Sequence, residues 1–190
     1  MATEASIVKK YEIADRDERV SIMLANFSSF ETQLDIEMEG IEYTVKEDHS
    51  HRRCYSIEEL GCRVQTSSSN YSPTEAKAIE NMEIERALQN HDFENPIFNH
   101  IIGVDEIRRD IYAIEIMRMD FSIFKKQLLI LKPLDRKMLM RLYSDGADYS
   151  TIAEEEAIDQ DSVRTRVYRA RTRVKNNMFL FWDNHSRRGL

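Results

Sequence analysis

The sequence predicts an all-α protein, with long amphipathic helices followed by a C-terminal helix-turn-helix domain. Only five of the 190 residues are glycine and three are proline, whereas 32% are charged. Apolar residues recur at steps of three and four within residues 20–45, 107–131 and 163–178, which is the spacing of one buried face on an α-helix. No apolar run approaches the roughly 20 residues that cross a membrane. The N-terminus also lacks a signal-peptide pattern, so we expect a cytoplasmic protein with no membrane partner.

The first 48 residues are predicted to contain one long amphipathic helix. Residues 1 to about 16 show no period and are expected to form a loose leader. Between Val20 and Val45, seven of eight positions at alternating steps of four and three are apolar. We favour a helix that packs inside its own domain, and a dimerising coiled coil is the alternative. The alternative would make residues 1–48 an oligomerisation element.

A polar segment follows at residues 49–72, which is rich in Ser, Asn and charges and is expected to be a linker or an extended arm. It contains a set of metal-binding residue types, because His49 and His51 precede Cys54 and Cys62. The second cysteine lies too far along the chain for a compact zinc knuckle, and no C-x-x-C pair is present. Ordinary loop residues with reduced thiols are therefore the favoured interpretation, and we expect neither a metal site nor a cofactor.

Residues 73–132 are predicted to form a helical scaffold. Ser72 suits an N-cap and Pro73 the first helical position, which indicates a helix that runs to about Asn90. A second helix begins near Ile107 and continues for about 25 residues, or about 37 Å. Its apolar residues exceed what one partner helix would cover, so some are expected to contact a second subunit. We therefore expect a homo-oligomer.

The C-terminal domain, residues 133–182, contains three helical pieces. Pro133 suits the first position of a helix, and Gly146 accepts the left-handed conformation that ends it. A short piece opens at Ser150, and Asp159 is placed to cap a third helix. A short helix followed by a longer one is typical of a helix-turn-helix. The third helix carries a continuous apolar stripe formed by Val163, Val167, Ala170, Val174 and Met178.

The exposed face of the third helix, residues 160–178, is basic and hydroxylated. The protein has a net charge of −7, yet from Gln160 onward eight basic residues stand against two acidic ones. An acidic body with one basic helix favours a single docking orientation on double-stranded DNA, which is the expected partner. A basic tail, residues 183–190, adds Arg187 and Arg188. The residues expected to contact base edges are Ser162, Thr165, Arg166 and Arg169, and those expected to hold phosphate are Arg164, Tyr168, Arg171 and Lys175.

Three runs carry a resemblance to a known family: LDRKMLMRLY, YSTIAEEEAI and DSVRTRVYRARTRV. In helix length, apolar positions and arginine spacing they resemble region four of bacterial sigma factors, the domain that binds the upstream promoter element. That family usually has Leu and Gly before the turn, where Glu156 and Ala157 stand here. The resemblance implies a helix-turn-helix that binds promoter DNA, with RNA polymerase as a further partner.

A fourth run, RVQTSSSNYSPTEAKAIE, resembles the middle of small phage-encoded transcriptional regulators of the RinA-like and ArpU-like type. Those regulators also end in a helix-turn-helix that is similar to sigma factor region four. Together the two resemblances imply a regulator of transcription, encoded by a phage or mobile element, that binds promoter DNA through residues 160–178.

Two other classes of protein remain open. A small terminase subunit also joins a helix-turn-helix to oligomerising helices, but it recognises DNA for packaging. An interaction protein would bind RNA polymerase or a sigma factor without reading bases. The sequence contains no Walker loop, no G-x-G-x-x-G and no other catalytic constellation, so we do not expect an enzyme.

Overall fold

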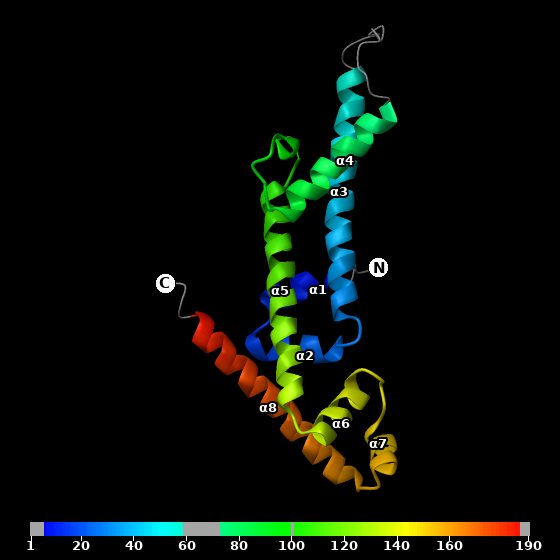
Figure 1. Cartoon of the computed structure of the whole chain (residues 1–190), viewed down its shortest axis with the longest axis vertical. Coiled ribbons are helices and arrows are strands. Elements are labelled where there is room, and N and C mark those ends of the chain that lie inside the picture. Colours follow the sequence, from blue (N-terminus) through cyan, green and yellow to red (C-terminus); the bar gives the residue numbers. More distant parts are fainter. Residues whose placement is uncertain (1–5, 59–72, 100, 187–190) are drawn as a thin grey trace. The chain divides into compact units, whose positions relative to one another are not determined.

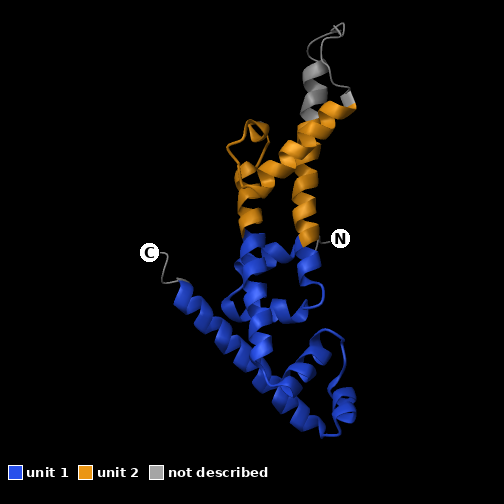
Figure 2. Ribbon diagram, viewed as in Figure 1, with its two compact units in different colours: residues 1–34, 113–190 blue, residues 35–112 orange. Residues whose placement is uncertain are grey.

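The structure of the chain is a computed structural model that describes residues 6–58, 73–99 and 101–186. Within these ranges every regular element is a helix, which confirms the predicted all-α class (Figure 1). The chain divides into two compact units, unit 1 (residues 1–34 and 113–190) and unit 2 (residues 35–112), which Figure 2 shows in blue and orange. The helices are α1 (Ile7–Ile13), α2 (Arg16–Ala25), α3 (Phe30–Glu58), α4 (Pro73–Gln89), the short 3-10 helix η1 (Pro96–Phe98), α5 (Val104–Ile130), α6 (Pro133–Tyr143), α7 (Tyr149–Glu156) and α8 (Gln160–Ser186).

Aromatic rings form a cluster at the centre of unit 1. Phe30 stacks on Phe121 of α5, with 4.6 Å between the ring centroids. Phe27 lies 5.5 Å from Phe121 and 6.2 Å from Phe124. Such pairs contribute about 0.5–1.5 kcal/mol each beyond the area that they bury. The rings therefore join the early part of the chain firmly to α5.

Residues 7–13 form a helix, although the sequence predicts a loose leader there. Ser6 caps α1 by accepting a hydrogen bond from the Val8 backbone N–H at 3.2 Å. Val8, Tyr11 and Ala14 are buried in unit 1. These three residues recur at steps of three over a single short helix, which is too brief a pattern to stand out in the sequence. The prediction of a leader over residues 1 to about 16 is therefore wrong for residues 7–13, while residues 1–5 lie outside the described residues.

The helix predicted between Val20 and Val45 is two helices in the structure, separated by residues 26–29. Asn26 ends the first of them. Its backbone N–H and its side-chain Nδ2 both donate to the carbonyl of Ile22, at 3.1 and 2.9 Å. A side chain that bonds to the preceding turn competes with helix continuation in this way. Val20 and Val45 are both buried, so the predicted apolar spacing holds on each side of the break.

Unit 2 has an apolar core of its own. Ile111 of α5 is fully buried in it. The predicted start of α4 at Pro73 is confirmed, whereas its expected cap, Ser72, lies outside the described residues. The buried core residues are Val45 of α3, Ile84, Ala87 and Leu88 of α4, Phe93, Phe98 of η1 and Ile111 of α5.

The predicted polar linker begins inside a helix, because α3 continues to Glu58. Two side chains, one at the start of the predicted linker and one just before it, pair with α4. Lys46 Nζ lies 2.6 Å from Glu85 Oε1, and His49 Nδ1 lies 3.4 Å from Glu80 Oε1. These partners are distant in sequence, so local composition does not reveal them.

The predicted zinc set falls largely outside the described side chains. His49 is described, and its ring faces Glu80 as stated above. The side chains of His51 and Cys54, and the whole of Cys62, lie outside the described residues. Among the side chains that the structure does describe, no group of three or more His, Cys, Asp or Glu is placed to hold a metal ion.

Asp120 of α5 is a carboxylate buried inside unit 1, with 7% of its surface exposed. One of its oxygens accepts the hydroxyl of Tyr11 from α1 at 2.8 Å, and the other accepts Nε1–H of Trp182 from α8 at 2.7 Å. Burial, followed by the charge of this carboxylate and the hydrogen bond to it, raises the pKa of Tyr11 above its usual range. One side chain thus holds α1, α5 and α8 together.

Helix α8 is longer than predicted, since it ends at Ser186 rather than near Met178. The apolar cluster at residues 179–182 therefore lies within the helix. Trp182 of this cluster contacts the buried Asp120, so at least this ring packs against the core of unit 1. Leu180 of the same cluster is 60% exposed.

Replacing Asp120 with Ala is expected to lower the free energy of unfolding by about 2–4 kcal/mol, because the Tyr11 hydroxyl and the Trp182 N–H would each lose an acceptor. Asp120→Asn is the matched control. Its amide oxygen can still accept from Trp182 and its amide N–H₂ can donate to the Tyr11 oxygen, so it should lose less. Urea unfolding measures both variants, and an equal loss in the two would show that the hydrogen bonds are not the stabilising feature.

Tyr11 is expected to make stability depend on alkaline pH. Its pKa is raised in the folded state, whereas the unfolded chain releases the same proton near pH 10. Above about pH 10 the unfolded state therefore binds fewer protons, and stability falls by about 1.4 kcal/mol per pH unit. Urea unfolding between about pH 8 and 11 should show a steeper loss for the natural protein than for Tyr11→Phe. Parallel curves for the two proteins would contradict the assignment.

Candidate nucleic-acid interface

Helices α6, α7 and α8 pack around a shared apolar core in unit 1. Met138 and Leu139 of α6 and Ile152 of α7 are each at most 1% exposed. Because this core fixes the inner side of α8, it also determines which side chains of α8 face outward. The predicted stripe of α8 is confirmed, since at most 3% of the surface is exposed for each of Val163, Val167, Ala170, Val174 and Met178.

Helix α7 begins at Tyr149, one residue earlier than predicted, and Asp148 is its N-cap. Asp148 Oδ1 accepts from the Thr151 backbone N–H at 2.7 Å and from the Ser150 hydroxyl at 2.9 Å. These hydrogen bonds, those from Thr151 first, lower the pKa of Asp148 to about 2. The cap is therefore negatively charged at neutral pH, which suits the positive end of the helix dipole.

The turn between α7 and α8 uses a residue in the left-handed region. Ala157 has φ 52° and ψ 44°, a conformation that glycine adopts without strain. This is the position at which sigma factors usually have Gly. Glu156, where those proteins usually have Leu, instead forms an ion pair with Lys137 of α6. The resemblance predicts an apolar contact at position 156, whereas the structure has an ion pair with α6 there.

Asp159 caps the start of α8, as the sequence predicts. Its carboxylate accepts from the Ser162 hydroxyl at 2.5 Å and from the Ser162 backbone N–H at 2.8 Å. These two hydrogen bonds, the one from the hydroxyl first, lower the pKa of Asp159. The Ser162 proton is thus engaged within the helix cap, while its oxygen can still accept a hydrogen bond.

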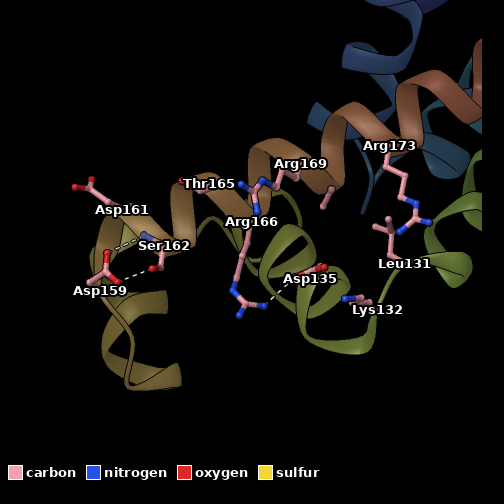
Figure 3. A pocket seen from close by; sticks show the side chains of 11 residues that line it. Leu131, Lys132, Asp135, Asp159, Asp161, Ser162, Thr165, Arg166, Arg169 and Arg173 are labelled. Carbon is pink, nitrogen blue, oxygen red and sulfur yellow. Dashed lines mark hydrogen bonds and ion pairs between the residues drawn. The ribbon is translucent and has the colours of Figure 1, made fainter.

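The four residues predicted to contact base edges lie together. They line a hollow of about 660 Å³ between α8 and the start of α6, which Figure 3 shows from close by. Arg166 points across this hollow, with its Nη1 3.2 Å from Asp135 Oδ1 of α6. The four predicted residues are Ser162, Thr165, Arg166 and Arg169.

Two further basic residues line the same hollow, although they are not among the DNA contacts predicted from the sequence. Arg173 follows Arg166 and Arg169 at steps of three and four, so helical spacing could have identified it. Lys132 precedes α6, and no local pattern connects it with α8. Four cationic side chains therefore surround the hollow together with three carboxylates, which are Asp135, Asp159 and Asp161.

The four residues predicted to hold phosphate do not line this hollow. Two of them contact α2 instead. Arg171 Nη2 donates to Ser21 Oγ at 3.0 Å, and Lys175 Nζ lies 2.5 Å from Asp17 Oδ1. The structure therefore separates Arg171 and Lys175 from the predicted base-contacting group.

The other two predicted phosphate contacts lie on an exposed side of α8. Tyr168 is 70% exposed. Arg164 has its guanidinium carbon 5.7 Å from the centre of the Tyr149 ring and its Nη1 3.4 Å from Asp161 Oδ1. Residues 187–190, which include both arginines of the predicted basic tail, lie outside the described residues.

Comparison with protein family models, with curated proteins and with solved structures finds no match to the chain. None of the helices in the described ranges is both long enough and apolar enough to span a membrane.

Replacing Ala157 with Gly is expected to stabilise the protein by about 1 kcal/mol, because glycine removes the cost of a side chain at positive φ. Ala78→Gly is the matched control. Ala78 is exposed in the interior of α4, where the same substitution should destabilise by about 1 kcal/mol. Urea unfolding of the two variants should therefore give changes of opposite sign, and a destabilised Ala157→Gly protein would contradict the turn geometry.

Proposed function

We propose that this protein is a sequence-specific, DNA-binding regulator of transcription and that α8 lies in the major groove of promoter DNA. The observation that carries the proposal is the grouping of Ser162, Thr165, Arg166 and Arg169 on one accessible side of the start of α8. Arginine pairs with guanine through two hydrogen bonds, and Ser and Thr bond to several base edges. Residues near the start of a recognition helix are those that reach bases in a helix-turn-helix.

The connection between α7 and α8 supports a helix-turn-helix. Residues 157–159 join the two helices, and turns of three or four residues are typical of this motif. In such motifs the second helix enters the major groove while the first crosses the DNA backbone. The buried stripe of α8 leaves its arginines on the outer sides, which is the arrangement that groove entry requires.

The distribution of charge supports binding in one orientation. The chain as a whole carries −7, whereas the hollow beside α8 gathers Lys132, Arg166, Arg169 and Arg173. We assign phosphate contacts to Lys132 and Arg173 in addition to the residues that the sequence predicts. Arg171 and Lys175 would first have to leave their α2 partners, so their phosphate contacts carry an additional energetic cost.

The proposed origin, location and protein partners of the chain are supported by the sequence resemblance and by the exposed apolar surface of α5. The resemblance to sigma factor region four and to phage-encoded regulators supports a phage or mobile-element origin. It also supports a cytoplasmic role at promoters, with RNA polymerase as a second partner. The exposed apolar residues of α5 support a homo-oligomer.

Selection of bound fragments from a genomic DNA library tests the proposal against its alternatives. Enrichment of one sequence motif would support base readout. Salt-sensitive retention of all fragments without a motif would favour a protein that interacts with RNA polymerase or a sigma factor. Assembly into a large ring, measured by light scattering, would favour a small terminase subunit.

Arg169→Ala is expected to weaken binding to the selected site by on the order of 1–3 kcal/mol and to relax the preference at one base pair. The reason is that Arg169 lines the hollow with the other predicted base-contacting residues. Fluorescence anisotropy with the selected site and with single-base variants of it measures both effects. An unchanged preference at every position would exclude Arg169 from base readout.

Lys175→Ala is the matched comparison on the same helix. If Lys175 exchanges Asp17 for a phosphate, its loss should weaken all DNA sequences about equally and reduce the slope of log affinity against log salt by about one. The same anisotropy titrations, repeated over a range of salt, give this slope. If neither Arg169→Ala nor Lys175→Ala alters DNA binding, α8 is not the DNA-binding helix.

A further inference from the structure

Helix α5 carries two apolar stripes within unit 1, and one of them is uncovered. The buried stripe packs into the unit and consists of Ile114, Met117, Phe121, Phe124 and Leu128. The second stripe lies on a different face of the helix from the buried one. Ile116 is 51% exposed, Met119 67% and Ile130 61%, and Ile123 between them is half-buried. Leu129, beside Ile130, is 67% exposed.

We propose that two copies of this chain pair along the exposed stripe of α5, with the two helices antiparallel. The stripe follows steps of three, four and seven from Ile116 through Met119 and Ile123 to Ile130, which is the heptad spacing of helices that pair side by side. The position that the heptad assigns between Ile123 and Ile130 is occupied by Lys126, which is exposed. This lysine determines the orientation.

A parallel pair in register would place Lys126 against Lys126 of the second copy, and like charges at such contacts repel. An antiparallel pair avoids this contact. In the register that sets Met119 against Ile123 of the second copy, Lys126 lies opposite Ile116 and next to Glu115 of the second copy. The two-fold symmetry repeats this charge pairing at the other end of the interface. Charge complementarity therefore selects a second, antiparallel copy as the occupant of the stripe.

The size of the stripe indicates a reversible dimer. The part of α5 within unit 1 covers 18 residues, about 27 Å of helix. A stable interface usually buries about 800 Å² on each partner, more than one row of side chains supplies. We therefore expect monomer and dimer to exchange with protein concentration. This inference deepens the homo-oligomeric part of the proposed function, since a two-fold dimer presents two copies of α8 to two half-sites.

Sedimentation without DNA tests self-association separately from DNA binding. The full chain should show a reversible monomer–dimer equilibrium, and Met119→Glu should raise the dissociation constant at least tenfold. Leu180→Glu is the matched control, because it replaces an equally exposed apolar residue on α8. Circular dichroism establishes that both variants remain helical. A monomeric natural protein at all concentrations, or a dimer that Leu180→Glu abolishes and Met119→Glu leaves intact, would overturn the proposal.

Disulfide cross-linking tests the orientation. In a background with Cys54→Ser and Cys62→Ser, the variants Ile116→Cys and Lys126→Cys are prepared separately and mixed under mild oxidation. In the antiparallel register the two cysteines face each other, whereas identical positions lie about 15 Å apart along the axis, too far for a disulfide. A mixed disulfide dimer is therefore expected. Disulfides between two copies of Ile116→Cys, both of which retain Lys126, would overturn the antiparallel arrangement.

Discussion

The carboxylate of Asp120 is the constraint on which the arrangement of unit 1 depends. A carboxylate removed from water must have its oxygens hydrogen-bonded, since an unpaired buried charge is very costly. Its two donors, Tyr11 and Trp182, come from opposite ends of the described chain. Both oxygens of this carboxylate are therefore satisfied only when the two ends meet on α5. A second link joins the same two ends of the chain. Arg16 of α2 forms an ion pair with Asp183 of α8, with 2.5 Å between Nη1 and Oδ1.

This arrangement divides the basic surface of α8 between two uses. One side faces α2, where Arg171 and Lys175 contact Ser21 and Asp17. The other side lines the hollow beside α6. The ion pair of Lys175 with Asp17 of α2 reduces the sequence-independent attraction of α8 for phosphate. What remains is a smaller basic surface, centred on the residues that are suited to base contacts.

The sequence predicts those features that repeat along one helix. The buried stripe of α8 from Val163 to Met178 and the grouping of the four base-contacting candidates follow from a period of 3.6 residues. Contacts between distant segments were not predictable in this way. The pairing of His49 with Glu80 lies in a segment that composition assigns to a linker, and the pairing of Lys175 with Asp17 redirects a predicted phosphate contact. Each depends on a partner that periodicity and composition do not identify.

The carboxylates beside α8 bear on specificity under the proposed function. Arg166 is held by Asp135 at 3.2 Å, so any DNA contact must replace that ion pair. A guanine at the correct position offers two acceptors in the plane of the guanidinium and can compensate for the exchange. Another base offers no such pair of acceptors, so the ion pair with Asp135 is lost without compensation. Binding to incorrect sequences is then opposed by the lost ion pair, which separates the right site from the wrong ones more effectively than an unpaired arginine would.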